Sequence, residues 1–255
     1  NFYLNICTIK IKSSIGNGDL GMEIFKFDRY ENENNRDFIY RSLRESIIRA
    51  TIKPGEAISE PKLQQIFNVS RSPIREAISV LDHEGLVEVQ PKKKTRVVLI
   101  DYQQIIESRF LRCIAEKEVL VNMCATKDTK PLADKLDKIL DEAENKYKNS
   151  KNFRTVIFDY DNMFHSAIFE YNGFSFVWKI LRLNNIQYNR FLNLYLEEQL
   201  YGEFFIKDHR EVAENIRNKA VDKLVSYTQQ NYERVEGYLK KLVLIHPDYF
   251  TNTQS

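Results

Sequence analysis

The chain has 255 residues, of which 43% are hydrophobic and 29% are charged. This length allows one large domain or two of ordinary size, and the composition is typical of a soluble, mostly helical globular protein. No apolar run approaches the roughly 18 residues of a membrane span, and Lys10 and Lys12 interrupt the stretch where a signal-peptide core would lie. We therefore expect a cytoplasmic protein without export or membrane insertion.

The net charge of +2 is unevenly distributed along the chain. Residues 36–100 contain twelve Lys or Arg and eight Asp or Glu, which gives this segment a net charge of +4 and leaves −2 for the remainder. A basic module joined to a neutral or slightly acidic body is typical of a nucleic-acid-binding head on a second domain. The charge distribution therefore favours a nucleic-acid-binding protein.

The first elements can be predicted from periodicity and turn residues. Residues 1–35 show no sustained hydrophobic period, and we leave them unassigned. From Asp37 the apolar residues recur at helical spacing, and this pattern stops at the turn around Pro54. Ser59 is a favoured N-cap residue, so we expect a short second helix that runs from there to about Phe67.

A third helix and a hairpin are predicted next. The helix should begin near Ser72, with Pro73 in its favoured first position, and end at Gly85. Two short Val-rich runs follow, at 86–90 and 96–100, and a basic loop separates them. Three helices followed by a β-hairpin predict a winged helix-turn-helix domain.

We assign this domain to residues 36–100 and expect it to bind DNA through its third helix. A recognition helix presents side chains to base edges from its N-terminal turns, and Arg can make a bidentate contact to guanine. The lysines of the wing tip form a basic cluster that a polyanion would stabilise. The predicted DNA-binding residues are Ser70, Arg71, Ser72, Arg75, Lys62, Lys92, Lys93 and Lys94.

The rest of the chain contains only helix-period segments. Asp101 and Gln104 form a capping-box-like start. The expected helices span 101–125, 129–149, 152–172, 175–200, 206–218 and 220–245. We therefore predict a mainly α protein with an all-helical antiparallel bundle over residues 101–246, which binds an effector and dimerises, and a tail over 247–255.

A metal-binding pattern lies inside this bundle. Asp161 and His165 are four residues apart, so they share one face of a helix and can hold a metal ion together. His209, which we place at the start of a later helix, can add a third ligand. A surface Asp–His pair would give the same pattern, so spacing alone leaves both interpretations open.

The DNA-binding module resembles the GntR family of regulators. The resemblance rests on Pro54–Glu60, Val69–Ile78 and Gly85–Val87. The chain departs from the family pattern at Pro61, where the family often has Arg, and at Lys94, where it has Gly in the wing. One phosphate contact is therefore expected to be lost, and the wing is expected to approach the minor groove differently.

The helical domain resembles the FCD type of the FadR-like GntR subfamily. The resemblance rests on Arg112–Glu116, Asp161–His165 and Asp208–Arg210. It implies that an Asp and three His hold a divalent metal, Zn, Ni or Mn, against which a small organic acid binds. Asp161, His165 and His209 match this set, whereas Asn231 stands where the third His is expected. An amide oxygen is a weaker ligand for zinc or nickel than imidazole, so metal binding should be weakened or altered in preference.

The resemblance also implies that an Arg in the first helix of this domain neutralises the carboxylate of the effector. Arg112 matches that position, and a structural ion pair with Glu116, one turn away, is the alternative interpretation. The aromatic-rich segment 153–178 is expected to be mostly core.

Together these patterns predict a homodimeric transcription regulator, a repressor more readily than an activator. It would bind a short palindrome of double-stranded operator DNA and respond to a small carboxylate. One alternative is a metal-independent pocket for a larger apolar effector such as an acyl-CoA. A second alternative is a metal-dependent hydrolase, although no general base is apparent from the sequence.

Overall fold

The computed structural model describes residues 9–10, 24–90, 94–149, 153–197 and 202–253. The chain divides into two compact units. The first comprises residues 1–100 and 246–251, and the second comprises residues 101–245 and 252–255. In the part of the chain that the structure describes, no helix is both long enough and apolar enough to span a membrane.

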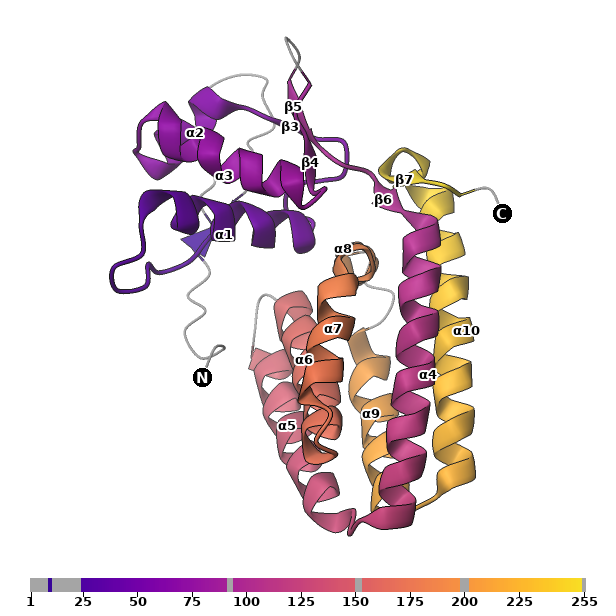
Figure 1. Cartoon of the computed structure of the whole chain (residues 1–255). Coiled ribbons are helices and arrows are strands. Elements are labelled where there is room, and N and C mark those ends of the chain that lie inside the picture. Colours follow the sequence, from indigo (N-terminus) through magenta and orange to yellow (C-terminus); the bar gives the residue numbers. More distant parts are fainter. Residues whose placement is uncertain (1–8, 11–23, 91–93, 150–152, 198–201, 254–255) are drawn as a thin grey trace. The chain divides into compact units, whose positions relative to one another are not determined.

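The first unit is a winged helix-turn-helix domain (Figure 1). Its helices are α1 (Asn35–Ile48), α2 (Glu60–Phe67) and α3 (Arg71–His83). A three-stranded antiparallel sheet in the order β3-β5-β4 consists of β3 (Ala57–Ile58), β5 (Thr95–Val97) and β4 (Val87–Glu88). Ala57 pairs with Arg96, and Val87 pairs with Val97. The sequence predicts the hairpin of β4 and β5, but the third strand, β3, is too short to show a period.

The apolar period of α3 explains how the helices pack. Ile74, Ala77, Ile78 and Leu81 are all buried, and α3 packs against both α1 and α2. Gly85 adopts a positive φ of 68°, which ends the helix as predicted because glycine tolerates this conformation.

One local prediction in this unit is wrong in detail. Ser59 is the N-cap residue of α2 as expected, although its side chain makes no capping hydrogen bond. α3 begins at Arg71, so Pro73 is the third residue of the helix and not the first. Pro is tolerated throughout the first helical turn because its missing N–H has no intrahelical partner there.

The segment before α1, which shows no period, contributes one antiparallel strand pair. β1 (Ile9–Lys10) pairs with β2 (Phe25–Lys26), and β2 contacts α1. Phe25 is buried, and its backbone N–H donates to Oγ of Ser46 at 2.7 Å. Phe25 and Ile24 therefore extend the core of the first unit.

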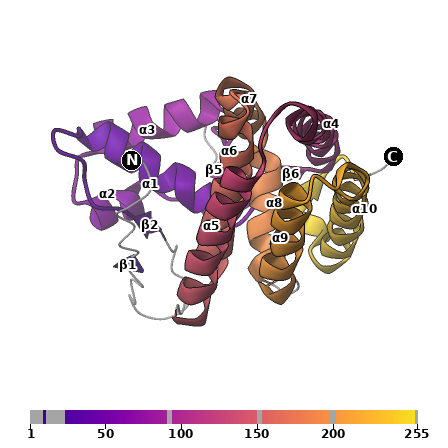
Figure 2. The ribbon, with the colours of Figure 1, turned by 90° about the horizontal axis from the view of Figure 1, so that it is seen from below.

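The second unit is an all-helical antiparallel bundle. It contains α4 (Tyr102–Thr126), α5 (Lys130–Asn149), α6 (Phe153–Tyr171), α7 (Ser175–Asn184), α8 (Ile186–Glu197), α9 (Gly202–Arg217) and α10 (Val221–Ile245). α4 lies alongside α10, and α5 packs against both α6 and α9 (Figures 1 and 2). Asp101 caps α4 as predicted, since its side chain accepts a hydrogen bond from the N–H of Gln104.

Two helices of the bundle differ from the prediction. The single helix expected over 175–200 is divided into α7 and α8, because the N–H of Asn185 bonds to the carbonyl of Arg182 and so interrupts the regular ladder. α9 begins at Gly202, four residues before the expected start, so His209 lies in the middle of the helix.

Two short strands, β6 (Ile100–Asp101) and β7 (Phe250–Thr251), pair with each other, and the 3-10 helix η1 (Pro247–Tyr249) precedes β7.

Candidate nucleic-acid interface and metal centre

The first turns of α3 expose two arginines. The side chains of Arg71 and Arg75 are 60% and 59% exposed, whereas Ile74 and Ile78 on the opposite face are buried. This division is what a recognition helix requires, because its buried face anchors the helix while its exposed N-terminal residues reach bases and phosphates.

Glu60, at the start of α2, holds both arginines. Its Oε2 atom accepts hydrogen bonds from Nε of Arg71 at 2.6 Å and from Nε of Arg75 at 3.2 Å. The hydrogen bond from Arg71, supported by Arg75, lowers the pKa of Glu60 despite some desolvation. Sequence reasoning did not assign Glu60 a role, because nothing in the spacing of α2 and α3 shows that one carboxylate meets two guanidinium groups.

The other predicted DNA-binding residues lie on the same domain. Ser70 is the exposed N-cap residue of α3, and the hydroxyl of Ser72 donates to Glu76 at 2.9 Å. Lys62 lies on α2 and is half-buried, and Lys94 is exposed beside β5. Lys92 and Lys93 lie outside the described residues.

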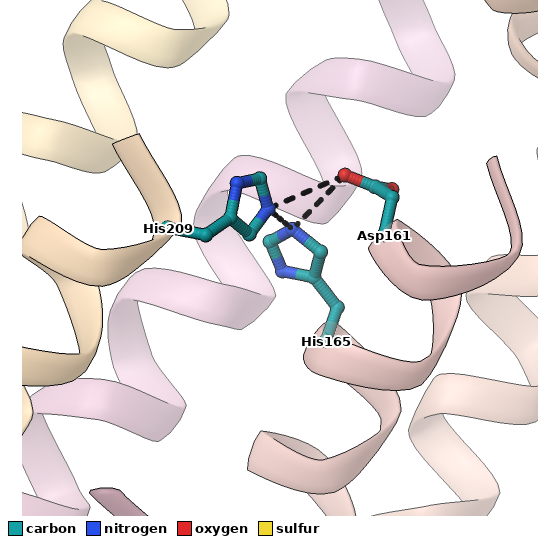
Figure 3. A group of neighbouring side chains, drawn as sticks. All are labelled: Asp161, His165 and His209. Carbon is teal, nitrogen blue, oxygen red and sulfur yellow. Dashed lines mark hydrogen bonds and ion pairs between the residues drawn. The ribbon is translucent and has the colours of Figure 1, made fainter. Parts of the chain in front are cut away.

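In the second unit, α6 and α9 bring together the three side chains predicted to hold a metal (Figure 3). Oδ1 of Asp161 lies 3.6 Å from Nε2 of His165 and 3.4 Å from Nε2 of His209. The two Nε2 atoms are 3.3 Å apart. Both imidazoles are buried, so the pattern is not a surface Asp–His pair.

The outer nitrogen of each imidazole has its own acceptor. Nδ1 of His165 donates to the carboxylate of Glu116 on α4, and Nδ1 of His209 donates to the backbone carbonyl of Phe205 at 2.9 Å. Carboxylate or carbonyl acceptors of this kind are the usual outer partners of metal-binding histidines. With the protons on Nδ1, both Nε2 atoms present lone pairs toward each other and toward Asp161.

The three ligand atoms fit a divalent ion. Ligands at about 2.0–2.1 Å from a tetrahedral metal are separated by roughly 3.3 Å, close to the 3.3, 3.4 and 3.6 Å found between these atoms. Three acceptors that face each other at such distances repel one another unless a cation or a proton lies between them. The geometry and the chemistry of these three side chains would therefore allow them to hold a metal ion.

The ionisation of the cluster follows from burial and from its charges. Burial and Arg112 both lower the pKa of His165, but Glu116 and Asp161 outweigh them and raise it. Burial raises the pKa of both Asp161 and Glu116, but His165 and Arg112 outweigh burial and lower both values. Both carboxylates are therefore ionised at neutral pH.

Arg112 lies beside this cluster and is buried. Its Nε is 3.6 Å from Oε2 of Glu116, and its Nη2 is 3.8 Å from Oδ2 of Asp161. The ion pair with Glu116 that the sequence suggested is thus present. Glu116 was predicted only as that partner, and its bond to His165 depends on the packing of α4 against α6.

A cavity of about 30 Å³ with both polar and apolar lining adjoins the cluster. Asp161, His165 and Arg112 line it, together with three polar residues from α4 and α10: Arg109, Asn231 and Arg234. Asn231 thus faces the same cavity as the triad, and its Oδ1 accepts a hydrogen bond from Nη2 of Arg109. Sequence reasoning missed Arg109 and Arg234. The only available signal for Arg109 was its position three residues before Arg112.

The chain combines a winged helix-turn-helix, whose third helix exposes two arginines, with an all-helical domain. This combination defines a bacterial transcription regulator that binds DNA. The model of the bacterial regulatory proteins of the gntR family matches residues 35–97, and the model of the FCD domain matches residues 111–234. The chain belongs to the GntR family and carries an FCD domain.

Comparisons over most of the chain agree with this family. The chain is 29% identical over 182 residues to an HTH-type transcriptional regulator in an unstable DNA locus of Streptomyces ambofaciens, an alignment covering 71% of this chain and 75% of that one. It is 28% identical over 211 residues to the gluconate operon transcriptional repressor of Bacillus licheniformis, covering 79% and 84%.

A solved GntR regulator from Rhodococcus sp. RHA1 shares the fold. It superposes with a TM-score of 0.62 at 22% identity and covers 78% of this chain and 94% of that one. The family and its relatives are transcription regulators and not enzymes, so the hydrolase alternative is wrong.

Proposed function

We propose that this chain is a metal-dependent, acid-responsive repressor. It binds a short palindromic operator as a homodimer, and a small organic acid bound in the helical domain controls its affinity for DNA. The observation that carries this proposal is the meeting of three acceptor atoms, from Asp161, His165 and His209, with both histidines fixed through Nδ1. A divalent ion held there would remove the repulsion between these acceptors, and it would leave coordination positions for a carboxylate.

DNA recognition is assigned to the first turns of α3. Arg71 and Arg75 contact base edges or adjacent phosphates, and Ser70 and Ser72 contact the phosphate backbone. Lys62 and the wing lysines, Lys92, Lys93 and Lys94, add phosphate contacts. Repression is supported by the relative from Bacillus licheniformis, which is named a repressor of the gluconate operon.

The metal would be held by Asp161, His165 and His209, and Zn, Ni and Mn are the candidates. When bound, it supplies a Lewis-acid centre that coordinates an anionic effector. Glu116 and the carbonyl of Phe205 fix the imidazoles in the binding tautomer. Arg112 contributes positive charge beside the effector carboxylate, and Asn231 remains a weak candidate for a further ligand.

The size of the cavity supports a small effector. Its volume is about 30 Å³, whereas pockets for drug-sized ligands are on the order of 300–1,000 Å³. Arginines, Asp161, His165 and Asn231 line one part of it, and apolar and aromatic side chains of α6, α8 and α10 line the rest. A short organic acid is closer to this volume than an acyl-CoA, which would have to displace several buried side chains.

A second copy of the chain is the proposed partner of an exposed apolar surface on the helical domain. α4 and α7 contact each other, and they expose Phe110, Leu111, Ile114, Phe176, Ile180 and Leu183. Exposed apolar groups of this number on neighbouring helices mark an interaction surface. Pairing through this dimer surface would place two recognition helices on one palindrome.

Elemental analysis of purified full-length protein, incubated with Zn²⁺, Ni²⁺ or Mn²⁺ and freed of excess metal, tests the proposal. We expect one ion per chain in the wild type and loss of the ion in His165→Ala and His209→Ala. His83→Ala, which removes an exposed histidine from α3, is the matched control and should keep the ion. Equal metal content in the wild type and in both site variants would refute the metal centre.

A further inference from the structure

The three arginines of the cavity differ in their partners. Arg112 lies near the carboxylates of Glu116 and Asp161, and Arg234 forms an ion pair with Asp208 at 2.5 Å. Among the described residues, no carboxylate lies within ion-pair distance of Arg109. Arg109 is therefore the one cavity guanidinium in the described part of the chain without a carboxylate partner.

Arg109 is nevertheless buried and held in place. Its exposed fraction is 4%, and its Cζ lies 4.8 Å over the ring of Tyr188. Nη2 donates to Oδ1 of Asn231, and Nε is buried without an acceptor among the described residues. A buried cation without a matching anion is costly, so this environment is suited to a ligand that brings a negative charge.

Asn231 positions the guanidinium. It lies on α10, which packs against α4, the helix that carries Arg109, and its amide oxygen engages only one of the five N–H donors. An amide is neutral, so it fixes Arg109 without cancelling its charge. Arg109 and Asn231 therefore form a pre-positioned anion-recognition pair on the wall of the cavity.

The net charge around the cavity with a divalent ion bound also favours an anionic ligand. Arg109, Arg112 and a divalent ion carry four positive charges, and Glu116 and Asp161 carry two negative charges. The ion pair of Arg234 with Asp208 adds no net charge. Two positive charges remain, and one carboxylate at the metal neutralises only one of them.

We infer that the effector carries two acidic groups. One binds at the metal beside Arg112, and the second binds the guanidinium of Arg109, which Asn231 holds. The inference rests on the proposed acid effector and narrows it to a small dianion, because the cavity is small and both Arg109 and Arg112 line it. A short dicarboxylate has this chemistry.

Calorimetric titration of full-length protein loaded with Zn²⁺ and freed of excess metal tests the inference. The probes are malonate, succinate and glutarate, each compared with the monocarboxylate of equal chain length: propionate, butyrate and valerate. We expect at least one diacid to bind about tenfold or more tightly than its monoacid, as a charge-assisted contact would give. Equal affinity within every pair overturns the inference.

Variants of Arg109 test whether this residue causes the preference for diacids. Arg109→Gln should lower diacid affinity to that of the monoacid and leave monoacid affinity within about threefold, and Arg109→Lys should give an intermediate value. Lys117→Gln removes an exposed charge from the same helix and should change neither. Metal content and thermal unfolding of each variant, measured in parallel, show whether the fold and the metal centre are intact.

The outcomes separate this inference from the proposed function. A diacid preference that persists in a folded, metal-loaded Arg109→Gln overturns the role of Arg109, while acid sensing stands. If neither diacids nor monoacids bind to the metal-loaded wild type, the acid effector itself is wrong, and the second acidic group is wrong with it.

Discussion

The carboxylate of Glu116 on α4 accepts a hydrogen bond from Nδ1 of His165 on α6, 49 positions later in the sequence. This bond fixes the tautomer of His165 and presents the lone pair of Nε2 to Asp161 and His209. Glu116 therefore orients one imidazole of the proposed metal centre without being a ligand itself.

Glu116→Gln should weaken metal binding by about 10–100-fold, because a neutral amide orients the imidazole less firmly and lowers its basicity. Competition with a chromophoric chelator measures the affinity. Glu118→Gln, which changes an exposed residue of the same helix, should bind metal as the wild type does. Unchanged affinity in Glu116→Gln would show that the bond has no part in metal binding.

Asn231→His should strengthen metal binding by roughly tenfold, since imidazole is a better ligand for zinc or nickel than an amide oxygen. The same change removes the acceptor of Arg109. The chelator competition above measures the effect, and Gln229→His, on an exposed position two residues away, is the control. If affinity does not rise, the side chain at position 231 does not reach the metal.

Arg75→Ala should reduce specific operator affinity about tenfold or more and leave the fold intact, because the side chain is exposed and its loss removes a base or phosphate contact. Fluorescence anisotropy with an operator selected from random DNA measures this. Ser79→Ala, on an exposed position one turn further along α3, should bind like the wild type. An unchanged affinity for Arg75→Ala would remove that residue from the interface.

Glu60→Gln should lower the ratio of specific to non-specific DNA affinity several-fold. The variant loses the group that positions Arg71 and Arg75, and it also loses a negative charge close to the DNA, which strengthens non-specific binding. Anisotropy with the selected operator and with a scrambled duplex gives the ratio. A ratio equal to that of the wild type would mean that the two arginines adopt their bound geometry without Glu60.

Glu60 should also contribute to stability in a pH-dependent way. Its pKa is lowered in the folded state, mainly by Arg71, so its contribution is complete above the unfolded-state value near 4.5 and is lost as the pH falls through the folded-state value. Because solvent screens these pairs, we expect on the order of 0.5 kcal/mol. Urea unfolding should give a higher free energy of unfolding for the wild type than for Glu60→Gln at pH 7, and equal values at pH 2. The opposite pH dependence would contradict the assignment.

Phe176→Glu should weaken self-association about tenfold or more, because a charge replaces the most exposed of the apolar side chains on the dimer surface. Sedimentation velocity measures the oligomeric state. Leu244→Glu, on an exposed apolar position near the end of α10, is the matched control and should leave association unchanged. Association that is lost in Leu244→Glu and retained in Phe176→Glu would place the interface elsewhere.

The sequence alone determined the local order of this protein. The helices follow a 3.6-residue period, and glycines such as Gly85 end them, so the winged helix-turn-helix and most of the helical bundle could be predicted. Asp161 and His165 could be paired because residues four apart share one face of a single helix. The exposed arginines of α3 were predictable for the same reason, since Ile74 and Ile78 fix the buried face.

The contacts between elements were decided only by the tertiary structure. Glu116 meets His165, Glu60 meets Arg71 and Arg75, and Asn231 meets Arg109. Each of these contacts joins two helices, and its geometry depends on how the helices pack and in what register. Period and spacing describe one helix at a time. They selected Asp161, His165, His209 and Arg112 as candidates, but they could not show that the amide of Asn231 holds the guanidinium of Arg109 beside them.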